Sequence, residues 1–443
     1  MMSGEFLKIE NIGCIRDACI KLDGLNVVAG KNDTGKSTVG KIMFSIVKGI
    51  SRHKEDFQSN KEQEVRVLID KIYYRLRREL DTRKEFEETR RLFFPPVFWK
   101  AVKDLLNENP SKESVGLLME ERIHYFKKEL ASSVQEEYIE LIESIIEIVS
   151  RKDTKEDQIK QALDKAFISE FCNELTPKKT LNEESRISYH SLDKIFEITI
   201  EHSKIKNIVL EDELLFQDVT YVESPVYLQL ANVIKNAETR FDFDMEKSAR
   251  LMRNRPKVSF HIKDLITKLE QSMYYADSLF DNNRDLLSSI AGIVRGAFEY
   301  DEKTSEFKFR RNQEMTVNAV NTASGIKAFG MIQLLIQANA LNERSMLIVD
   351  EPENHLHPEW QVKYADIITE LVKNDISVLI NSHSPYMIQA LSYFAEKKDI
   401  KDKTSFFLTK RIGDSQMTTF ENVTDDVERI FKTLAEPINE IMW

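Results

Sequence analysis

Apolar and polar residues alternate, or form short apolar runs, over the first thirty residues of the chain. This pattern is typical of β-strands, and it predicts strands at residues 6–10, 15–22 and 25–28. A helix is expected to begin near Gly35. The opening therefore predicts three strands, a loop and a helix.

The middle of the chain has a different period. Between residues 52 and 185 apolar residues recur every three or four positions among many charges, which is typical of amphipathic helices. Helices are expected at residues 62–91, 110–130, 133–150 and 155–175. No strict heptad persists over several turns, so a compact helical subdomain is favoured over a long coiled coil.

The remainder of the chain returns to strands alternating with helices. Strands or hairpins are expected at 196–200, 208–210, 219–222, 299–310, 345–349 and 377–380, and helices at 326–342 and 358–373. Seven of the 13 glycines lie in the first fifty residues, and only Gly116 lies between Gly49 and Gly292. We therefore predict an α/β protein whose head is formed by residues 1–51 and 186–443 and is interrupted by a helical insertion at 52–185.

Composition narrows the class of protein. A chain of 443 residues with 42% hydrophobic and 31% charged residues is typical of a globular protein with two or three cores. The net charge of −11 excludes a uniformly basic surface but leaves a local basic groove possible. Cys14, Cys19 and Cys172 form no Cys-x-x-Cys pair, which argues against a disulfide scaffold. No apolar run is long enough for a membrane helix and no targeting signal is present, so we expect a cytoplasmic protein without a membrane partner.

The strongest chemical motif is the segment GKNDTGKS, which follows an apolar strand and precedes a helix. Its glycines allow backbone N–H groups to turn toward phosphates, Lys36 is placed to meet the β- and γ-phosphate oxygens, and the Ser37 hydroxyl is placed to ligate Mg²⁺. We therefore predict a site for ATP and Mg²⁺. The residues expected to contact the nucleotide in this segment are Gly30, Asn32, Asp33, Thr34, Gly35, Lys36, Ser37 and Thr38.

Two later strands end in polar residues. Asp350 and Glu351 follow an apolar strand; we expect Asp350 to ligate Mg²⁺ and Glu351 to polarise the attacking water. Such a pair often only caps a helix, but the phosphate loop favours the catalytic interpretation. His383 follows the next strand, and its position after the acidic pair favours a role as γ-phosphate sensor over a structural one.

Ser324 and Gly325 precede a predicted helix and offer a hydroxyl, free backbone N–H groups and the positive end of the helix. The alternative is an ordinary serine N-cap. Because the chain already has one phosphate loop, we expect this second anion site to bind the γ-phosphate of a nucleotide held by another copy. A homodimer or a higher homo-oligomer is therefore predicted.

These four elements, in this order, resemble the ABC-type AAA ATPases of the SMC/RecF/OLD-like branch. The segment LKIENIGCI at residues 7–15 is similar to the start of that branch, and DEPENHLHP at 350–358 closely matches OLD-like and bacterial antiphage ATPases. The resemblance covers residues 5–50 and 315–390. It implies an ABC-type P-loop ATPase head, with a mixed β-sheet core and an antiparallel β subdomain, carrying a large helical insertion.

By this resemblance Ser324 and Gly325 correspond to the signature motif, residues 354–357 to the D-loop and His383 to the switch histidine. His357 is therefore expected to contact the nucleotide. Lys327 stands where transporters have glutamine, which predicts an ionic contact with the nucleotide of the other copy. Gln217 is a candidate for the Q-loop.

The resemblance also bears on biological role. OLD nucleases carry a Toprim domain after the ATPase, whereas only residues 384–443 follow the switch histidine here, so no nuclease activity is expected in this chain. His355, His357 and His383 are not expected to bind zinc, since the D-loop already accounts for the first two. We expect an ATPase that dimerises around ATP and regulates a separately encoded effector, a nuclease or a toxin, in bacterial antiphage defence. DNA or a phage product would be the trigger.

Two alternatives remain. One is an SMC/RecF-like repair or recombination ATPase that acts directly on DNA. The other is an ATP-stabilised structural scaffold with little turnover.

Overall fold

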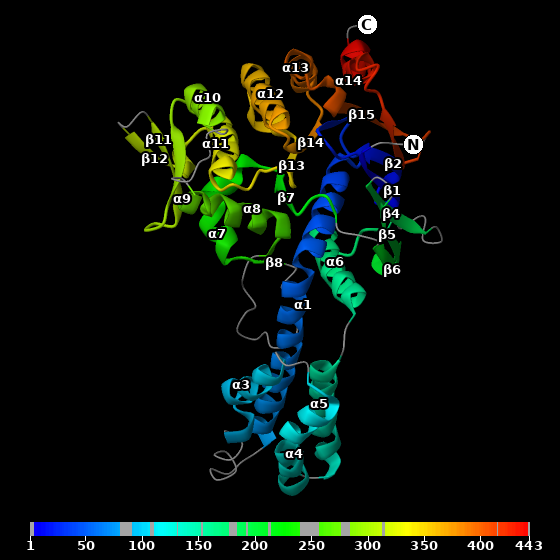
Figure 1. The fold of residues 1–443 in the computed structure, drawn as a ribbon, viewed down its shortest axis with the longest axis vertical. Helices are drawn as coiled ribbons and strands as arrows, with labels where there is room; N and C mark the ends of the chain where they lie inside the picture. Colours follow the sequence, from blue (N-terminus) through cyan, green and yellow to red (C-terminus); the bar gives the residue numbers. More distant parts are fainter. Residues whose placement is uncertain are drawn as a thin grey trace. The chain divides into compact units, whose positions relative to one another are not determined.

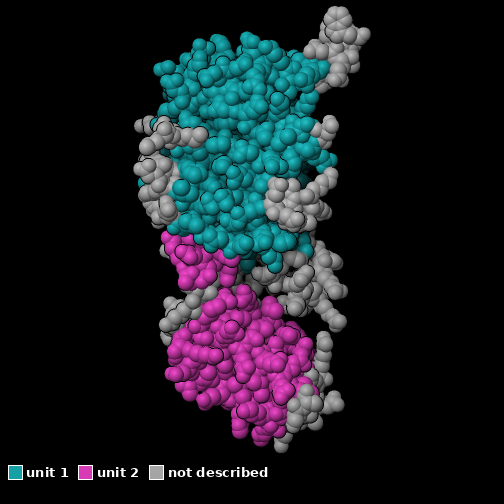
Figure 2. Space-filling view, turned by 90° about the vertical axis from the view of Figure 1, so that its right-hand side faces the viewer, with its two compact units in different colours: residues 1–51, 163–241, 256–443 teal, residues 52–162, 242–255 magenta. Residues whose placement is uncertain are grey.

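The computed structural model describes residues 4–79, 91–106, 110–130, 132–151, 154–176, 184–191, 194–210, 214–239, 257–275, 284–311, 315–413 and 415–441. The chain divides into two compact units (Figure 2). The first is built from residues 1–51, 163–241 and 256–443, and the second mainly from residues 52–162. None of the helices among the described residues combines the length and apolarity that crossing a bilayer requires.

The first unit is organised around an 11-stranded sheet with the order β6-β5-β4-β1-β2-β16-β15-β3-β14-β13-β7 (Figure 1). Its strands are β1 (Glu5–Ile12), β2 (Ile15–Lys21), β3 (Leu25–Ala29), β4 (Ser185–Ser191), β5 (Lys194–Glu201), β6 (Lys204–Leu210), β7 (Asp218–Val222), β13 (Ser345–Asp350), β14 (Ser377–Ser382), β15 (Thr404–Arg411) and β16 (Thr418–Asn422). Strands β15, β3, β14, β13 and β7 are mutually parallel. Strands β6, β5, β4, β1 and β2 are antiparallel. The predicted fold class, a mixed sheet with an antiparallel β subdomain, is confirmed.

Helices surround the parallel part of the sheet. The helices that lie wholly within the described part of the first unit are α7 (Ala231–Asn236), α8 (Phe260–Glu270), α9 (Ser272–Tyr275), α10 (Arg284–Val294), α11 (Ser324–Gln337), α12 (Pro358–Lys373), α13 (Pro385–Lys397) and α14 (Glu428–Ile441). Short 3-10 turns are η1 (Pro225–Leu230), η4 (Ala319–Asn321), η5 (Pro352–His355) and η6 (Lys401–Lys403). Small sheets are formed by β8 (Glu238–Thr239) with β9 (Lys257–Val258), and by β10 (Ala297–Asp301), β11 (Glu306–Arg311) and β12 (Met315–Asn318).

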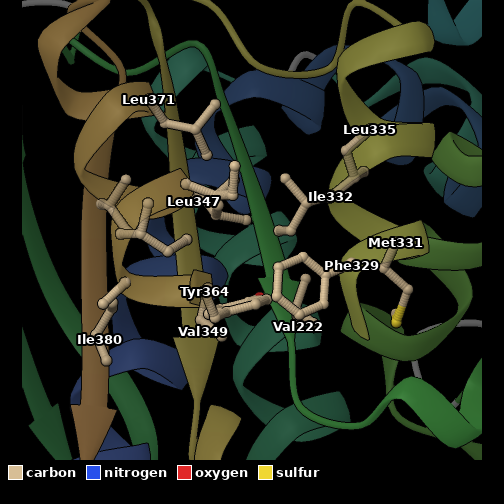
Figure 3. Close-up of a cluster of buried hydrophobic side chains, with 14 of the residues drawn as sticks. Val222, Phe329, Met331, Ile332, Leu335, Leu347, Val349, Tyr364, Leu371 and Ile380 are labelled. Carbon is tan, nitrogen blue, oxygen red and sulfur yellow. The ribbon is translucent and has the colours of Figure 1, made fainter. Parts of the chain in front are cut away.

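The central strands are buried along their whole length. Every residue of β3, β13 and β14 is buried, which explains why these strands read as apolar runs rather than as alternating patterns. Figure 3 shows the core that forms between these strands and two helices. Phe329, Ile332 and Leu335 of α11 and Tyr364 and Leu371 of α12 pack with Leu347 and Val349 of β13.

The second unit has its own helical core. It contains α3 (Pro95–Leu106), α4 (Lys112–Glu129), α5 (Ser132–Ser150) and the later part of α1 (Lys36–Glu79), a helix of 44 residues that begins in the first unit. Phe93 stacks on Phe126 with ring centroids 4.9 Å apart. The guanidinium carbon of Arg122 lies 4.1 Å from the ring centroid of Phe98. Aromatic packing is therefore a main source of cohesion in this unit.

Helix α6 (Lys155–Phe171) runs from the second unit into the first. Gly49 leaves room for Leu163, since a Cβ at Gly49 would lie 2.7 Å from Cδ2 of that leucine. The hydroxyl of Ser169 accepts a hydrogen bond from the backbone N–H of Phe260. Described residues after 162 thus pack within the first unit, whereas the sequence placed the boundary at residue 185.

Some predicted ends of helices differ from those in the structure. Helix α11 ends at Gln337 rather than at residue 342, because Asn339 adopts a left-handed conformation with φ of 53°. The predicted helix at 62–91 runs past Glu79 into positions 80–90, which lie outside the described residues. Strands β15 and β16 were not predicted.

Candidate nucleotide site

Four parallel strands end at one edge of the sheet, and this edge brings the predicted motifs together. The register pairs Ala29 of β3 with Ser382 of β14, and Asn381 with Asp350 of β13. Val349 in turn pairs with Val222 of β7. In open α/β sheets, ligands bind in the crevice at the carboxyl ends of the strands. The phosphate loop, the acidic pair, His383 and the residues after β7 therefore share one edge.

The phosphate loop lies close to its neighbours, which explains its glycines. A Cβ at Gly30 would lie 1.8 Å from Oγ1 of Thr409, and the φ of Gly30 is 154°. A Cβ at Gly35 would lie 2.7 Å from Cγ1 of Ile15, and the φ of this glycine is 84°. Only glycine fits both positions without displacing β15 or β2.

Lys36 is buried, and its ammonium lies inside the loop. Its Nζ donates to the carbonyl oxygens of Gly30 at 3.1 Å and Lys31 at 2.8 Å. Burial lowers the pKa of the Lys36 amine, while the charges of Glu351, Asp350 and Glu353 oppose that shift. The Lys36 ammonium therefore lies in the electrostatic field of these three carboxylates.

The remaining loop residues fall into two groups. Thr34 is buried; its hydroxyl donates to Lys31 O at 2.8 Å and accepts from the Thr409 hydroxyl at 2.7 Å. Asn32 and Asp33 are exposed, and Ser37 and Thr38 are half-buried at the start of α1. The first N–H groups of a helix lack intrahelical acceptors, so this helix start offers donors to an anion. Thr34 shapes the loop, and its contact with a nucleotide stays a prediction.

A cavity of about 610 Å³ adjoins the phosphate loop. It lies between the loop, the end of β15 and α14. Its lining carries the cations Lys31, Lys410, Arg411, Arg429 and Lys432. Several of these are paired within the chain: Lys31 lies 2.7 Å from Oε2 of Glu436, and Arg411 lies 3.5 Å from Oδ2 of Asp33.

Asp350 is held from both sides by buried donors. The Tyr221 hydroxyl donates to its Oδ2 at 2.9 Å, and the Asn381 amide donates to its Oδ1 at 2.9 Å. Burial, together with the charge of Asp350, raises the pKa of Tyr221 well above its usual value, so the phenol stays a donor. The sequence analysis missed both partners. Tyr221 could have been found from the sequence, because it lies in an apolar segment predicted as a strand, and a buried tyrosine hydroxyl requires a hydrogen-bond partner.

Glu351 turns its carboxylate toward the open edge. It adopts the left-handed conformation with φ of 46°, which is strained for a non-glycine residue and concentrates at functional sites. Its Oε2 accepts from the Asn354 amide at 2.8 Å, and its Oε1 lies 3.5 Å from Nδ1 of His383. The side chain is 29% exposed, so it is open to water from the edge. Glu351, Asn354 and His383, the residues predicted for the base, the D-loop and the switch histidine, thus lie in contact.

The turn that carries Asn354 also contributes a carboxylate that the sequence analysis did not assign. Oε1 of Glu353 accepts from the Ser382 hydroxyl at 2.9 Å, from His383 N at 2.6 Å and from Ser384 N at 3.1 Å. Nδ1 of His383 lies 3.1 Å from the same oxygen. The loop that carries His383 is therefore bound to the turn after the acidic pair by hydrogen bonds.

Residues 2–388 match the AAA ATPase domain family. The chain belongs to this family. Members of this family are ATPases, so the chain is an ATPase that uses ATP, ordinarily with Mg²⁺. A comparison with curated proteins gives no match.

Solved structures similar to this AAA ATPase are distant. The SMC head domain from Thermotoga maritima is 9% identical, with 96% of this chain and 99% of that chain covered and a TM-score of 0.37. An Smc head domain from Pyrococcus furiosus, bound to the C-terminal domain of ScpA, is 9% identical, with 98% and 99% covered and a TM-score of 0.40. An ATP-binding cassette of an ABC transporter is 11% identical, with 99% and 96% covered and a TM-score of 0.33.

The residues predicted as the signature motif, Ser324 and Gly325, lie at the start of α11. Ser324 is its first residue, and the N-cap, Ala323, offers no side-chain acceptor. The serine is therefore not the N-cap itself, which removes the alternative weighed for it. A Cβ at Gly325 would lie 3.0 Å from Cε3 of Trp360, so this glycine also lets α11 begin against α12.

Lys327 is buried, whereas His357 is exposed. Lys327 is 4% exposed, and its Nζ donates to Oε1 of Gln229 in the same chain. Burial lowers the pKa of its amine. His357 is exposed and caps α12, accepting from Glu359 N at 3.4 Å. The predicted contacts of both residues with a nucleotide stay predictions.

Gln217, the candidate for the Q-loop, lies far from the acidic pair. Gln217 precedes β7, and the register pairs Asp218 with Ser345 at the start of β13. Gln217 therefore lies at the opposite edge of the sheet from Asp350, about 20 Å away along the strands at 3.3 Å per residue. Glu223 follows the carboxyl end of β7 and lies at the correct edge.

The residues present suit a nucleotide with a divalent cation. The Asp350 carboxylate and the half-buried Ser37 hydroxyl, beside the phosphate loop, are oxygen ligands of the kind that Mg²⁺ prefers. Ser37 and Asp350 are the residues that would hold it. No group of three or more His, Cys, Asp or Glu side chains in the described part of the chain is arranged to hold a metal by itself. A cation held jointly by the protein and a phosphate agrees with that finding.

Proposed function

We propose that this ATPase binds ATP with Mg²⁺ between two copies of the chain and hydrolyses it with Glu351 as the general base. We further propose that the cycle regulates a separately encoded effector, a nuclease or a toxin, in bacterial antiphage defence. The observation that carries the hydrolytic part is the open carboxylate of Glu351, which stands on a left-handed backbone, beside His383 and at the same sheet edge as Asp350.

Each residue has a distinct task in this proposal. Lys36 and the N–H groups of the loop hold the phosphates, and Ser37 with Asp350 holds the cation, which neutralises charge that develops on the phosphates. Glu351 accepts the proton of the attacking water. His383 orients that water and contacts the γ-phosphate.

The second anion site supports dimerisation. Helix α11 has 14 residues, and no side chain caps its first turn, so its N–H groups remain open to an anion. A head-to-tail pair would place this helix start of one copy over the phosphates bound by the other. Each seam would then contain Lys36 from one copy and Ser324 from the other.

Glu351→Gln tests the hydrolytic part. We expect its turnover number to fall about 100-fold or more, because the amide cannot accept the proton. ATP-dependent dimers should persist, as measured by light scattering. Glu343→Gln, at an exposed glutamate, is the matched control. Equal turnover in the two variants would refute Glu351 as the base, and equally low turnover in both would leave an ATP-stabilised scaffold.

Mixing two inactive variants tests the shared seam. Lys36→Ala destroys the phosphate loop, and Ser324→Glu places a negative charge at the second anion site. Each variant alone should be inactive, whereas a mixture should recover activity, because one seam of a mixed dimer keeps both wild-type halves. A mixture as inactive as its components would argue against the shared site.

The biological role is proposed from the similarity of residues 350–358 to OLD-like and antiphage ATPases. Purification from the native operon should retrieve a second protein, and Glu351→Gln should abolish protection in a phage challenge. ATP-dependent DNA binding by the chain alone, weakening steeply with salt, would instead favour a repair or recombination ATPase.

A further inference from the structure

Glu353 is a buried carboxylate in η5, the turn that follows the acidic pair. Its side chain is 5% exposed. Its Oε1 accepts three hydrogen bonds, from the Ser382 hydroxyl, His383 N and Ser384 N. All three donors belong to the loop that presents the switch histidine. One oxygen thus fixes both the start and the direction of this loop.

Burial of the Glu353 carboxylate lowers the stability of the fold, so its position calls for a reason other than stability. Removing a carboxylate from water is unfavourable, and paired donors only partly offset that cost. The second oxygen of Glu353, Oε2, is buried without a hydrogen-bond partner among the described residues. A buried group without a hydrogen-bond partner calls for an explanation, and a role at the site would supply one.

The loop also has anchors that do not involve Glu353. The Ser384 hydroxyl donates to Oε1 of Gln361 at 2.6 Å, and the Gln361 amide donates to Leu356 O at 3.0 Å. These contacts tie the loop to α12. Loss of Glu353 should therefore loosen the loop locally rather than unfold it.

We propose that Glu353 is a positioning residue that holds the loop so that the His383 imidazole stands beside the Glu351 carboxylate. Its neighbour Asn354 bonds to Glu351 at 2.8 Å, so the same turn orients both the base and the histidine. A movement of η5 at the proposed interface between two copies would thus displace both the Glu351 carboxylate and the His383 imidazole. The inference rests on the proposed function, because it concerns the same hydrolysis.

Turnover of a double-mutant series tests the proposal. Glu353→Ala should lower kcat about 10- to 100-fold, with nucleotide affinity within about threefold of wild type, because Glu353 acts through the histidine and not on the phosphate loop. Glu353→Gln keeps an acceptor oxygen and should recover most of the rate. In a His383→Ala background, Glu353→Ala should have little further effect. Glu359→Ala, at an exposed glutamate of α12, is the control.

Two results would overturn the proposal. Additive losses in the double variant would mean that Glu353 does not act through His383. A loss of nucleotide affinity as large as the loss of kcat would mean that it supports the fold of the site in general.

Hydrogen exchange of the nucleotide-free protein gives a readout that needs no turnover. The amides of His383 and Ser384 donate to Glu353, so Glu353→Ala should speed their exchange at least about tenfold, and Glu353→Gln should not. Unchanged exchange would refute the positioning role. A wild-type protein without ATPase activity would refute the proposed function instead, and exchange would then decide alone whether Glu353 holds the loop.

Discussion

Tyr221→Phe is the substitution that tests most directly how the fold supports the cation site. It removes the hydroxyl that donates to Oδ2 of Asp350 at 2.9 Å and changes little else. Tyr221 is fully buried, and Asp350 is 6% exposed, so water is poorly placed to replace the lost donor. Asp350 would then keep only the hydrogen bond from Asn381.

The expected magnitudes follow from this geometry. A hydrogen bond to a charged group contributes about 1.5–3 kcal/mol to the free energy of unfolding, so Tyr221→Phe should lower that free energy by a similar amount. Residues that orient a metal ligand typically affect metal affinity about 10- to 100-fold. The Mg²⁺ concentration that gives half-maximal ATP hydrolysis should rise by a factor in that range.

The assay is a titration of ATPase rate with Mg²⁺, together with thermal unfolding. Tyr364→Phe is the matched control, because Tyr364 is a buried tyrosine of α12 whose pKa is raised by burial alone. It should leave the Mg²⁺ dependence unchanged. The reasoning is refuted if Tyr221→Phe requires no more Mg²⁺ than the control does.

Two further predictions concern the loop and the interior. Gly30→Ala should destabilise the first unit by about 3 kcal/mol or more in thermal unfolding, since its Cβ would lie 1.8 Å from Oγ1 of Thr409 at a φ of 154°. Gly292→Ala, where nothing lies within 4 Å of the added carbon, should not destabilise it. Burial alone would lower the pKa of His261, but hydrogen bonds to Glu170 and a second carboxylate raise it to about 9. Because this pKa exceeds that of an unfolded histidine, protonated His261 should contribute about 3 kcal/mol to the free energy of unfolding below pH ~6.5, and this contribution should be lost as pH rises through 9. The free energy of unfolding, measured from pH ~6 to ~10, should therefore fall with rising pH. His261→Gln should remove most of this pH dependence.

The elements that could be predicted from the sequence are those specified by a short, contiguous segment of the chain. The phosphate loop and the start of α1 at Lys36 depend on a contiguous motif, and α12 was predicted with its observed bounds, because Pro358 begins it and its apolar period is clear. The acidic pair and His383 follow buried strands whose apolar runs are visible in the sequence.

The partners of these residues could not be predicted, because they come from distant segments. Tyr221 and Asp350 are separated by 129 positions, and they meet only because β7 pairs with β13 in parallel. The same register places Gln217 at the opposite edge, which no local pattern reveals.

The sequence by itself thus determined which chemistry the chain carries, since a phosphate loop, a metal ligand and a base are each specified by a few adjacent residues. Only the tertiary structure decided how these groups are held, including the task of Glu353, whose three donors lie about thirty positions further along the chain. The physical reason is that side-chain hydrogen bonds depend on strand order and register, and these are set by long-range packing of the sheet and its helices.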